Sequence, residues 1–393
     1  MSDRRRLLMS GSDLPTGVAE FTWYATKAVS NAILLKLNEI KPSSLLSSVT
    51  INGVNISIPT TQKDLTYSFP SAGYYTMRIK VKNSTSSMGV YFPKNAFLHP
   101  ASNSATWALG DNSTYYCIEM NLSGLVFDYT NGIAGFLPSL GALSNSVTNR
   151  LQHIIMPKVN WTVTAKSWPP TFSNSPYLEK ISNFKNIDCS GGFNTNQTGS
   201  FHNCKVLTEL VVENCDFSQG GFPDFSEGGH PLLQKVEIKN CKISCSVVPA
   251  PMKKNETNPQ TIELLDYSGT NFSYNTTKIG DGSSSNKAFY AKKILFNNCI
   301  FGKLTTIDFN NHSTIEELDF TNCNLSTITK FIIYNCTNLK KLVITGPLSS
   351  LDTTYTSDFW ITNTPNVTLY YNDDSTYNKF KSKAPSTWKY VKI

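Results

Sequence analysis

The sequence predicts a β-rich α/β solenoid, a stack of short coils preceded by a small antiparallel β domain. A unit typified by residues 313–326, STIEELDFTNCNLS, recurs along most of the chain. The centre of this unit alternates apolar and polar side chains, which is the period of a short strand. Charged residues make up only 16% of the 393 residues, so the chain is poor in charge and rich in turn-forming residues.

Residues 1–17 are predicted to form a flexible docking peptide. Arg4, Arg5 and Arg6 precede an apolar run that is shorter than the roughly 7 to 15 residues of a secretory signal. We therefore expect no signal peptide here, and no later stretch reaches the roughly 18 apolar residues of a membrane span. The three arginines are docking candidates for an acidic partner.

Residues 18–90 are predicted to form a small β-sandwich-like domain. Five short runs rich in β-branched and aromatic residues are separated by Ser, Pro, Asn and Gly. Asn52-Gly53 is a hairpin signal, because both central residues of a type I′ turn need positive φ. Residues 91–121 are expected to be a connector or a first irregular coil.

Residues 122–365 carry the repeats. Successive units begin 24 to 29 residues apart, which is typical of a solenoid. Counting from the first residue of a unit, offsets 0, +3, +5 and +10 are apolar and predicted to be buried. The starts are Leu122, Leu151, Leu178, Leu207, Leu233, Ile262, Ala291, Ile315 and Leu339.

Cysteines fill a further column of the repeat. Offset +8 holds Cys215, Cys241, Cys299 and Cys323, with Thr270 between the middle pair. A small, weakly polar side chain suits the point where the chain leaves the strand and its backbone groups need partners. The nine cysteines contain no C-x-x-C pair, so we expect buried structural thiols and no zinc site.

The spacing L-x-x-L-x-[apolar]-x-x-C-x-[apolar] resembles the leucine-rich repeat, and more narrowly the cysteine-bearing BspA-like repeats of gut-bacterial and phage-borne surface proteins. The resemblance implies a right-handed array with parallel strands on the concave face. The run TYSFPSAGYYTMRIKVK resembles the small module that precedes such repeats. Residues 366–393 are similar to their closing segment, which implies a C-terminal cap with a strand, a short helix near 375–383, and a final strand at 388–393.

Offsets +2, +4 and +6 are expected to face the concave surface. Offset +2 nearly alternates in charge, so Lys293, Glu317 and Lys341 are predicted to form a cross-strand ladder, as are Lys180, Glu209 and Lys235. Offset +4 mixes aliphatic and acidic side chains on a face expected to be exposed, which is typical of a partner surface. Cover by long loops or by a neighbouring subunit is the competing explanation. The partner-binding candidates are Ile155, Val211, Glu237, Asp266, Leu295, Asp319 and Val343.

Catalysis is the less favoured hypothesis. Glu317 and Asp319 share a strand face, as two carboxylates of an inverting glycosidase would. Lysine neighbours would hold Glu317 ionised, however, and the five histidines share no metal or triad spacing. The net charge of +7 includes no block of five basic residues, so nucleic-acid binding is not expected. The sequence predicts no enzyme, no cofactor and no bound metal.

The expected function is that of a non-catalytic recognition or structural protein. Without a secretion signal, a phage virion fibre or decoration subunit is favoured, mounted through its N-terminus and binding a protein or glycan on a host surface. The alternatives are a secreted bacterial cell-surface adhesin and, less favoured, a polysaccharide depolymerase. The expected location is the virion or an extracellular surface, without membrane insertion, and self-association into a homo-oligomer is left open.

Overall fold

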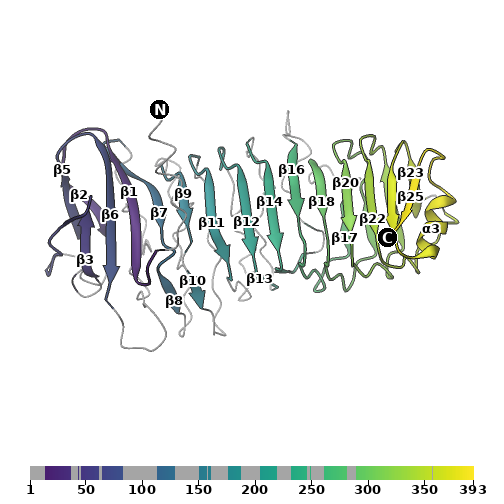
Figure 1. Cartoon of the computed structure of the whole chain (residues 1–393), viewed down its shortest axis with the longest axis horizontal. Helices are drawn as coiled ribbons and strands as arrows, with labels where there is room; N and C mark the ends of the chain where they lie inside the picture. The colour runs from purple at the N-terminus through teal and green to yellow at the C-terminus, as the bar shows by residue number, and fades with distance from the viewer. Residues whose placement is uncertain are drawn as a thin grey trace. The chain divides into compact units, whose positions relative to one another are not determined.

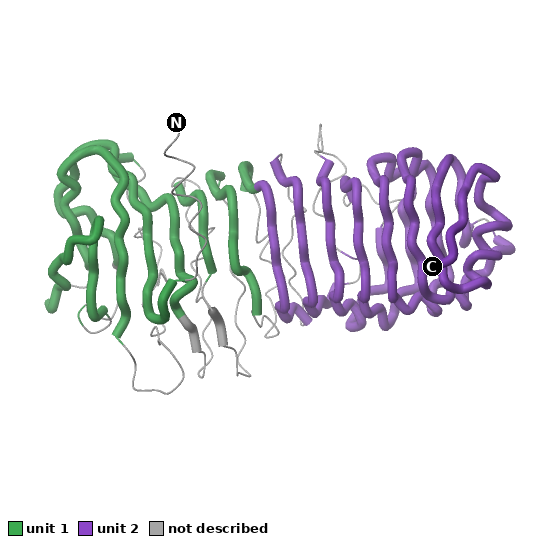
Figure 2. The backbone as a smooth tube through the Cα atoms, viewed as in Figure 1, with its two compact units in different colours: residues 1–191, 203–207 green, residues 192–202, 208–393 purple. Residues whose placement is uncertain are grey.

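The computed structural model describes residues 14–36, 43, 46–61, 64–82, 113–128, 150–156, 158–160, 176–186, 204–218, 232–245, 248, 261–280, 289–355 and 357–393. It is a β-solenoid with parallel strands and almost no helix. The chain divides into two compact units, residues 1–191 with 203–207, and residues 192–202 with 208–393, coloured green and purple in Figure 2.

The first unit combines antiparallel and parallel strands. Its main sheet has the order β11-β9-β7-β1-β6-β3-β4, in which β1 is antiparallel to both β6 and β7. From β7 to β11 the pairing is parallel. β2 pairs with β5 antiparallel and β8 with β10 parallel. The strands are β1 (Val18–Ala25), β2 (Val29–Lys36), β3 (Leu46–Ile51), β4 (Val54–Asn55), β5 (Asp64–Phe69), β6 (Gly73–Val81), β7 (Tyr115–Asn121), β8 (Val126–Asp128), β9 (His153–Ile155), β10 (Lys158–Asn160) and β11 (Lys180–Lys185).

The first unit contains the predicted Asn52-Gly53 turn and the predicted end of the N-terminal domain at residue 90. The Asn52-Gly53 turn is confirmed, because both residues have positive φ, of 48° and 81°, and Ile51 pairs with Val54. Strand β7 lies beyond residue 90 yet pairs with β1 along its length, so the sheet continues past the end of the expected N-terminal domain. A separate domain over 18–90 stays a prediction.

The second unit has two parallel sheets, one on each side of its coils. The long sheet runs in the order β12-β14-β16-β18-β20-β22-β24-β25, and Figure 1 shows its strands from β12 to β22 side by side. The return sheet has the order β17-β19-β21-β23. The long-sheet strands are β12 (Glu209–Glu213), β14 (Lys235–Lys239), β16 (Ile262–Asp266), β18 (Ala291–Leu295), β20 (Glu317–Phe320), β22 (Lys341–Ile344), β24 (Thr368–Tyr371) and β25 (Lys389–Lys392). The return-sheet strands are β17 (Lys278–Ile279), β19 (Thr306–Asp308), β21 (Lys330–Tyr334) and β23 (Phe359–Thr362), and β13 (Asp216–Phe217) pairs with β15 (Lys242–Ile243).

The expected repeat register is confirmed in this unit. Residues at offset +3 pair with one another from strand to strand, and each is fully buried. At offset +5, the ring of Phe296 stacks between those of Tyr267 and Phe320, with centroid distances of 5.4 and 5.1 Å. The offset +3 partners are Leu210, Val236, Leu265, Ile294, Leu318 and Leu342.

The return sheet is the main departure from the α/β expectation. Apart from the C-terminal segment, the described residues opposite the long sheet form strands where an α/β solenoid would have helices. In Phe331–Tyr334 and Phe359–Thr362, β-branched and aromatic residues alternate toward the core, which favours a strand. The C-terminal segment has the expected order, since α3 (Asp374–Lys381) lies between β24 and β25. Asp373 caps this helix by accepting a hydrogen bond from the backbone N–H of Thr376 at 2.8 Å.

Five coils of the second unit leave their long-sheet strands through a corner with two recurring residues. The first lies in the left-handed region of φ, and it is Asn in four of the five corners from 214 to 322 and Gly269 in the fifth. The second is the buried residue at offset +8, Cys in four corners and Thr270 in the other. The corner pairs are Asn214-Cys215, Asn240-Cys241, Gly269-Thr270, Asn298-Cys299 and Asn322-Cys323.

The donor at offset +8 joins a corner to the preceding coil. The Thr270 hydroxyl donates to the carbonyl of Ile238 at 2.6 Å, and the Cys323 thiol donates to the carbonyl of Phe296 at 2.8 Å. Buried carbonyls need such partners. The asparagine amides also pair across coils, since Asn322 Nδ2 donates to Asn298 Oδ1 at 3.0 Å.

The corner geometry predicts a difference between two substitutions of Asn322. Its φ of 57° disfavours a Cβ, so Asn322→Ala should lower the free energy of unfolding by about 1–2 kcal/mol. Asn322→Gly should cost less, because glycine adopts this φ without strain. Urea denaturation of the two variants and the parent protein measures the difference, and equal losses for Ala and Gly would contradict it.

Candidate functional site

The candidate site is the outer face of the long sheet, formed by offsets +2, +4 and +6. Strand register sets the offset +4 side chains of the second unit in one row, since Asp266 pairs with Glu237 and Leu295, and Asp319 pairs with Leu295 and Val343. Val211 pairs with Glu237 at the start of this row. Ile155 lies on β9 in the first unit.

The row is less exposed than the sequence predicts. Asp266, Asp319 and Val343 are 5%, 8% and 3% exposed, and Ile155 is 4% exposed. Val211, Glu237 and Leu295 are half-buried. Strands about 4.8 Å apart bring equivalent side chains into contact, which removes part of their surface from solvent. The expectation that this mixed aliphatic and acidic row is exposed is therefore wrong for its four buried members, whereas partner binding by these residues stays a prediction.

The two buried aspartates close turns at the ends of their strands. Asp319 Oδ1 accepts hydrogen bonds from the backbone N–H and the hydroxyl of Thr321, at 2.8 and 2.6 Å. Asp266 Oδ1 accepts the same pair of bonds from Ser268, at 2.9 and 2.5 Å. The sequence signal is Asp followed two residues later by Ser or Thr, a local pattern that competes with the ladder and ends a strand.

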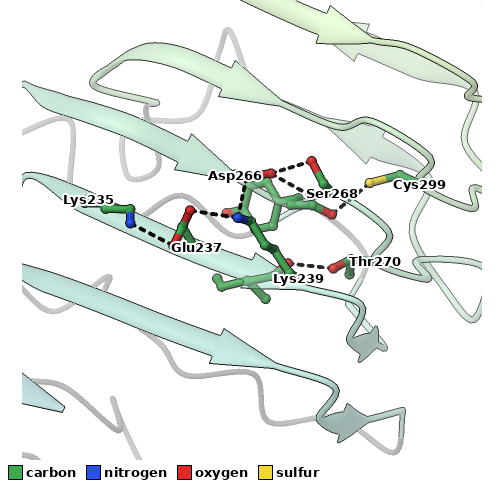
Figure 3. A network of polar contacts seen from close by, with 9 residues as sticks. Lys235, Glu237, Lys239, Asp266, Ser268, Thr270 and Cys299 are labelled. Carbon is green, nitrogen blue, oxygen red and sulfur yellow. Dashed lines mark hydrogen bonds and ion pairs between the residues drawn. The ribbon is translucent and has the colours of Figure 1, made fainter. Parts of the chain in front are cut away.

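A charged network surrounds Glu237, and Figure 3 shows it running from β14 to β16. The carboxylate of Glu237 lies 2.9 Å from the ammonium of Lys235 and 2.8 Å from that of Lys239. Lys239 also lies 3.2 Å from Asp266. Partial burial acts to raise the pKa of Glu237, but hydrogen bonds from the two lysines outweigh it and hold that pKa below its usual value.

The predicted charge ladder at offset +2 forms in the C-terminal coils. Glu317 lies between Lys293, at 3.8 Å, and Lys341, at 2.6 Å. In the other predicted ladder, Glu209 and Lys235 are register partners, and the Lys235 ammonium also reaches Glu237. Exposed pairs of this kind contribute at most about 1 kcal/mol each.

A second ladder at offset +1 was missed by sequence reasoning. Lys292 lies 2.7 Å from Glu263, and Lys340 lies 2.7 Å from Glu316. The alternation of Glu and Lys one residue after each start is visible in the sequence at 263, 292, 316 and 340. The acidic and basic groups of this face thus largely neutralise one another.

Glu317 and Asp319, the pair considered for glycosidase chemistry, both accept hydrogen bonds from neighbouring residues. Glu317 accepts a hydrogen bond from Lys341 at 2.6 Å, and Asp319 accepts from Thr321.

The first unit brings together three residues that the sequence did not connect. His153 Nε2 lies 3.0 Å from the Ser182 hydroxyl, and His153 Nδ1 lies 3.3 Å from Glu119 Oε1. The order hydroxyl, imidazole, carboxylate is that of a nucleophile relay. At Ser182 the backbone of β11 pairs with β9, and the Ser182 carbonyl accepts a hydrogen bond from the backbone N–H of Met156. The side-chain contacts thus link β7, β9 and β11. Thr22 adds a hydrogen bond to Glu119 Oε2 at 3.3 Å.

Seven of the eight cysteines in the described ranges are buried, in agreement with the prediction of buried thiols, and Cys245 is half-buried. Burial raises the pKa of Cys323 and of Cys336 to about 12, and it also raises the pKa of Cys117 and Cys299. A thiol that keeps its proton is a weak nucleophile and a poor metal ligand.

Three further expectations concern the N-terminal arginines, membrane spans and metal sites. Arg4, Arg5 and Arg6 lie outside the described residues, as do most of the loops between coils. The residues that are described include no helix long and apolar enough to cross a membrane. Within the same part of the chain, no three His, Cys, Asp or Glu side chains gather as a metal site would require.

No protein-family model matches this sequence, and comparison with curated proteins and with solved structures gives no significant match. The geometry of the described residues therefore carries the functional argument.

The network around Glu237 predicts a pH dependence of stability. Because the pKa of Glu237 is lowered in the folded state, its contribution is present above the unfolded pKa of about 4.3 and is lost as pH falls through the folded value. Glu237→Gln should therefore flatten the decline in unfolding free energy between about pH 5 and pH 3.

Lys239→Met is the matched variant, because it removes a cation that contacts both Glu237 and Asp266. It should flatten the same part of the profile. Denaturation midpoints measured across this pH range test both variants, and profiles parallel to that of the parent protein would contradict the assignment.

The thiol environment predicts slow alkylation. In the folded protein at pH 8, Cys323 and Cys336 should resist iodoacetamide, because burial keeps both protonated. Half-buried Cys245 should react faster and serves as the internal comparison. Peptide mass spectrometry before and after unfolding measures the rates, and equal labelling of Cys323 and Cys245 in the folded protein would be the contrary result.

Proposed function

We propose that this chain is a non-catalytic recognition or structural protein, a phage virion fibre or decoration subunit that presents its solenoid to a host surface or glycan. The observation that carries the proposal is the paired outer face of the long sheet. Its carboxylates are held by lysines and by strand-end hydroxyls and amides, which suits a stable display scaffold.

The finer architecture belongs to the same proposal. We take the solenoid to be a right-handed, BspA-like leucine-rich-repeat array, and residues 18–90 to be a separate β domain that mounts it. The sequence spacing supports the first assignment, since the offset columns of the repeat coincide with paired residues on adjacent strands. The antiparallel pairings of β1, β3 and β6 support the second.

Attachment is proposed to run through the N-terminus. Arg4, Arg5 and Arg6 would meet an acidic virion protein, and the ladders at offsets +1 and +2 would keep the outer face balanced in charge. In the alternative, a secreted bacterial adhesin, the same solenoid would be attached to the cell surface in a different way. In either setting the protein needs no cofactor.

A binding assay that also follows chemistry tests the proposal. Fluorescently labelled protein should bind bacterial surface polysaccharides or cells and should release no reducing ends from any polysaccharide it binds. A fluorophosphonate probe should leave Ser182 unmodified, because the contacts around His153 serve to tie strands.

Release of reducing ends would contradict the proposal and restore the depolymerase hypothesis. Covalent labelling that disappears in Ser182→Ala would also contradict it, since it would assign the Ser182, His153 and Glu119 contacts to catalysis. Ser123→Ala removes another serine of the first unit and is the control for the probe.

A further inference from the structure

The outward face of the return sheet carries an aromatic pair in the last two strands. Along β21 and β23 the side chains of Phe331, Ile333, Phe359 and Ile361 point into the core, and alternate residues point outward. The rings of Tyr334 and Trp360 stack there, with centroids 4.3 Å apart and planes 26° from parallel.

We propose that Tyr334 and Trp360, here called the aromatic platform, form a binding subsite for a neutral pyranose sugar. The inference rests on the proposed function and names the class of ligand and the place where it binds. The ligand would then bind at the return sheet and not at the offset +4 row of the long sheet, which is largely buried.

Trp360 is one of several exposed aromatic residues of the second unit, with Tyr355 at 61% and Tyr274 at 36%, and its ring stacks on that of Tyr334. Its side chain is 37% exposed, whereas Tyr267, Phe296 and Phe309 are at most 1% exposed. Trp360 pairs in register with Ile332, which is only 5% exposed, so an apolar side chain lies beside the indole on β21.

Trp360 lies on the last strand of the return sheet. Strand β23 is last in the order β17-β19-β21-β23, and Tyr334 on β21 occupies the inner side of Trp360. In the described part of the chain, this sheet has no strand beyond β23. The indole is rigid, with two side-chain torsions, so little conformational entropy is lost when a flat apolar surface packs against it. The C–H face of a pyranose is such a surface.

Hydrogen-bonding groups for sugar hydroxyls lie directly after these strands. Asn335 follows Tyr334 and donates to Asn311 at 2.7 Å, and Asn363 follows Thr362 and donates to Asn335 at 2.6 Å. Each of these bonds uses one N–H of a primary amide, which has two, and one lone pair of the carbonyl oxygen, which also has two. A row of neutral amides beside a ring suits uncharged hydroxyls. Small-molecule sites combine an apolar surface with a few placed polar groups in this way.

The test uses affinity electrophoresis of the full chain in gels that contain dextran, yeast mannan or mixed-linkage β-glucan, with alginate as an acidic comparison. At least one neutral polysaccharide should retard the protein. Trp360→Ala should weaken that binding by about tenfold or more, as loss of a central aromatic anchor does. Tyr334→Ala should weaken it in the same direction.

Tyr274→Ala is the matched control, because Tyr274 is another exposed aromatic residue of the second unit, at 36%. It should bind as the parent protein does. Thermal unfolding checks that each variant is folded, and Trp360→Phe, which keeps a ring, should retain part of the binding if the indole acts as a stacking surface.

Three results would overturn the inference. Binding that is unchanged in Trp360→Ala would place the ligand elsewhere and leave the proposed function standing. Failure of all three neutral polysaccharides to retard the parent protein would remove a neutral glycan as the ligand. A dimer in size-exclusion chromatography that dissociates in Trp360→Ala would show that a second copy of this chain covers the platform.

Discussion

The architecture of the second unit depends on the hydrogen bond that a buried side chain at offset +8 donates to a main-chain carbonyl of the preceding coil. A coil that turns sharply leaves carbonyls without strand partners, and a buried carbonyl without a donor costs about 1–3 kcal/mol. Cys299, Cys323 and Thr270 supply this donor at the long-sheet corners. Cys336 does the same in the return sheet, where it donates to the carbonyl of Phe309. The residue before each donor has a left-handed φ, which turns the chain so that the donor side chain points inward.

In the five coils that have this corner, it fixes the phase of the coil and thereby the columns on both faces. Once offset +8 is held, offsets +3 and +5 fall in the core, where Phe296 stacks between Tyr267 and Phe320. Offsets +1 and +2 then meet their counterparts across strands, and Glu317 reaches two lysines. The same repeated geometry explains why position 269 is glycine, because a Cβ there would lie 2.1 Å from the side-chain oxygen of Asn240. The core packing and the surface columns thus follow from one repeated geometry.

Much of this could be predicted from the sequence, because the evidence is periodic. Strands β14, β20 and β22 begin at the predicted offset +2, and the Asn-Cys pairs mark corners whose chemistry follows from residue type. The return sheet was not predicted, since the repeat columns end at offset +10 and the return-sheet strands begin 15 to 20 residues after each start. The burial of Asp319 depends on neighbours that only the register supplies, and the contact between His153 and Ser182 joins residues 29 positions apart in sequence. Trp360 escaped notice because a single aromatic residue outside the repeat columns has no periodic signal.

The most direct test of this account is the stability of Thr270→Val relative to the parent protein and to Thr270→Cys. Valine keeps the shape of threonine and removes the hydroxyl that donates to Ile238, whereas cysteine restores a donor used in neighbouring coils. The account predicts that valine lowers the free energy of unfolding by about 1–3 kcal/mol and that cysteine lowers it by less. A valine variant as stable as the parent protein would contradict the claim that this hydrogen bond holds the coils in register.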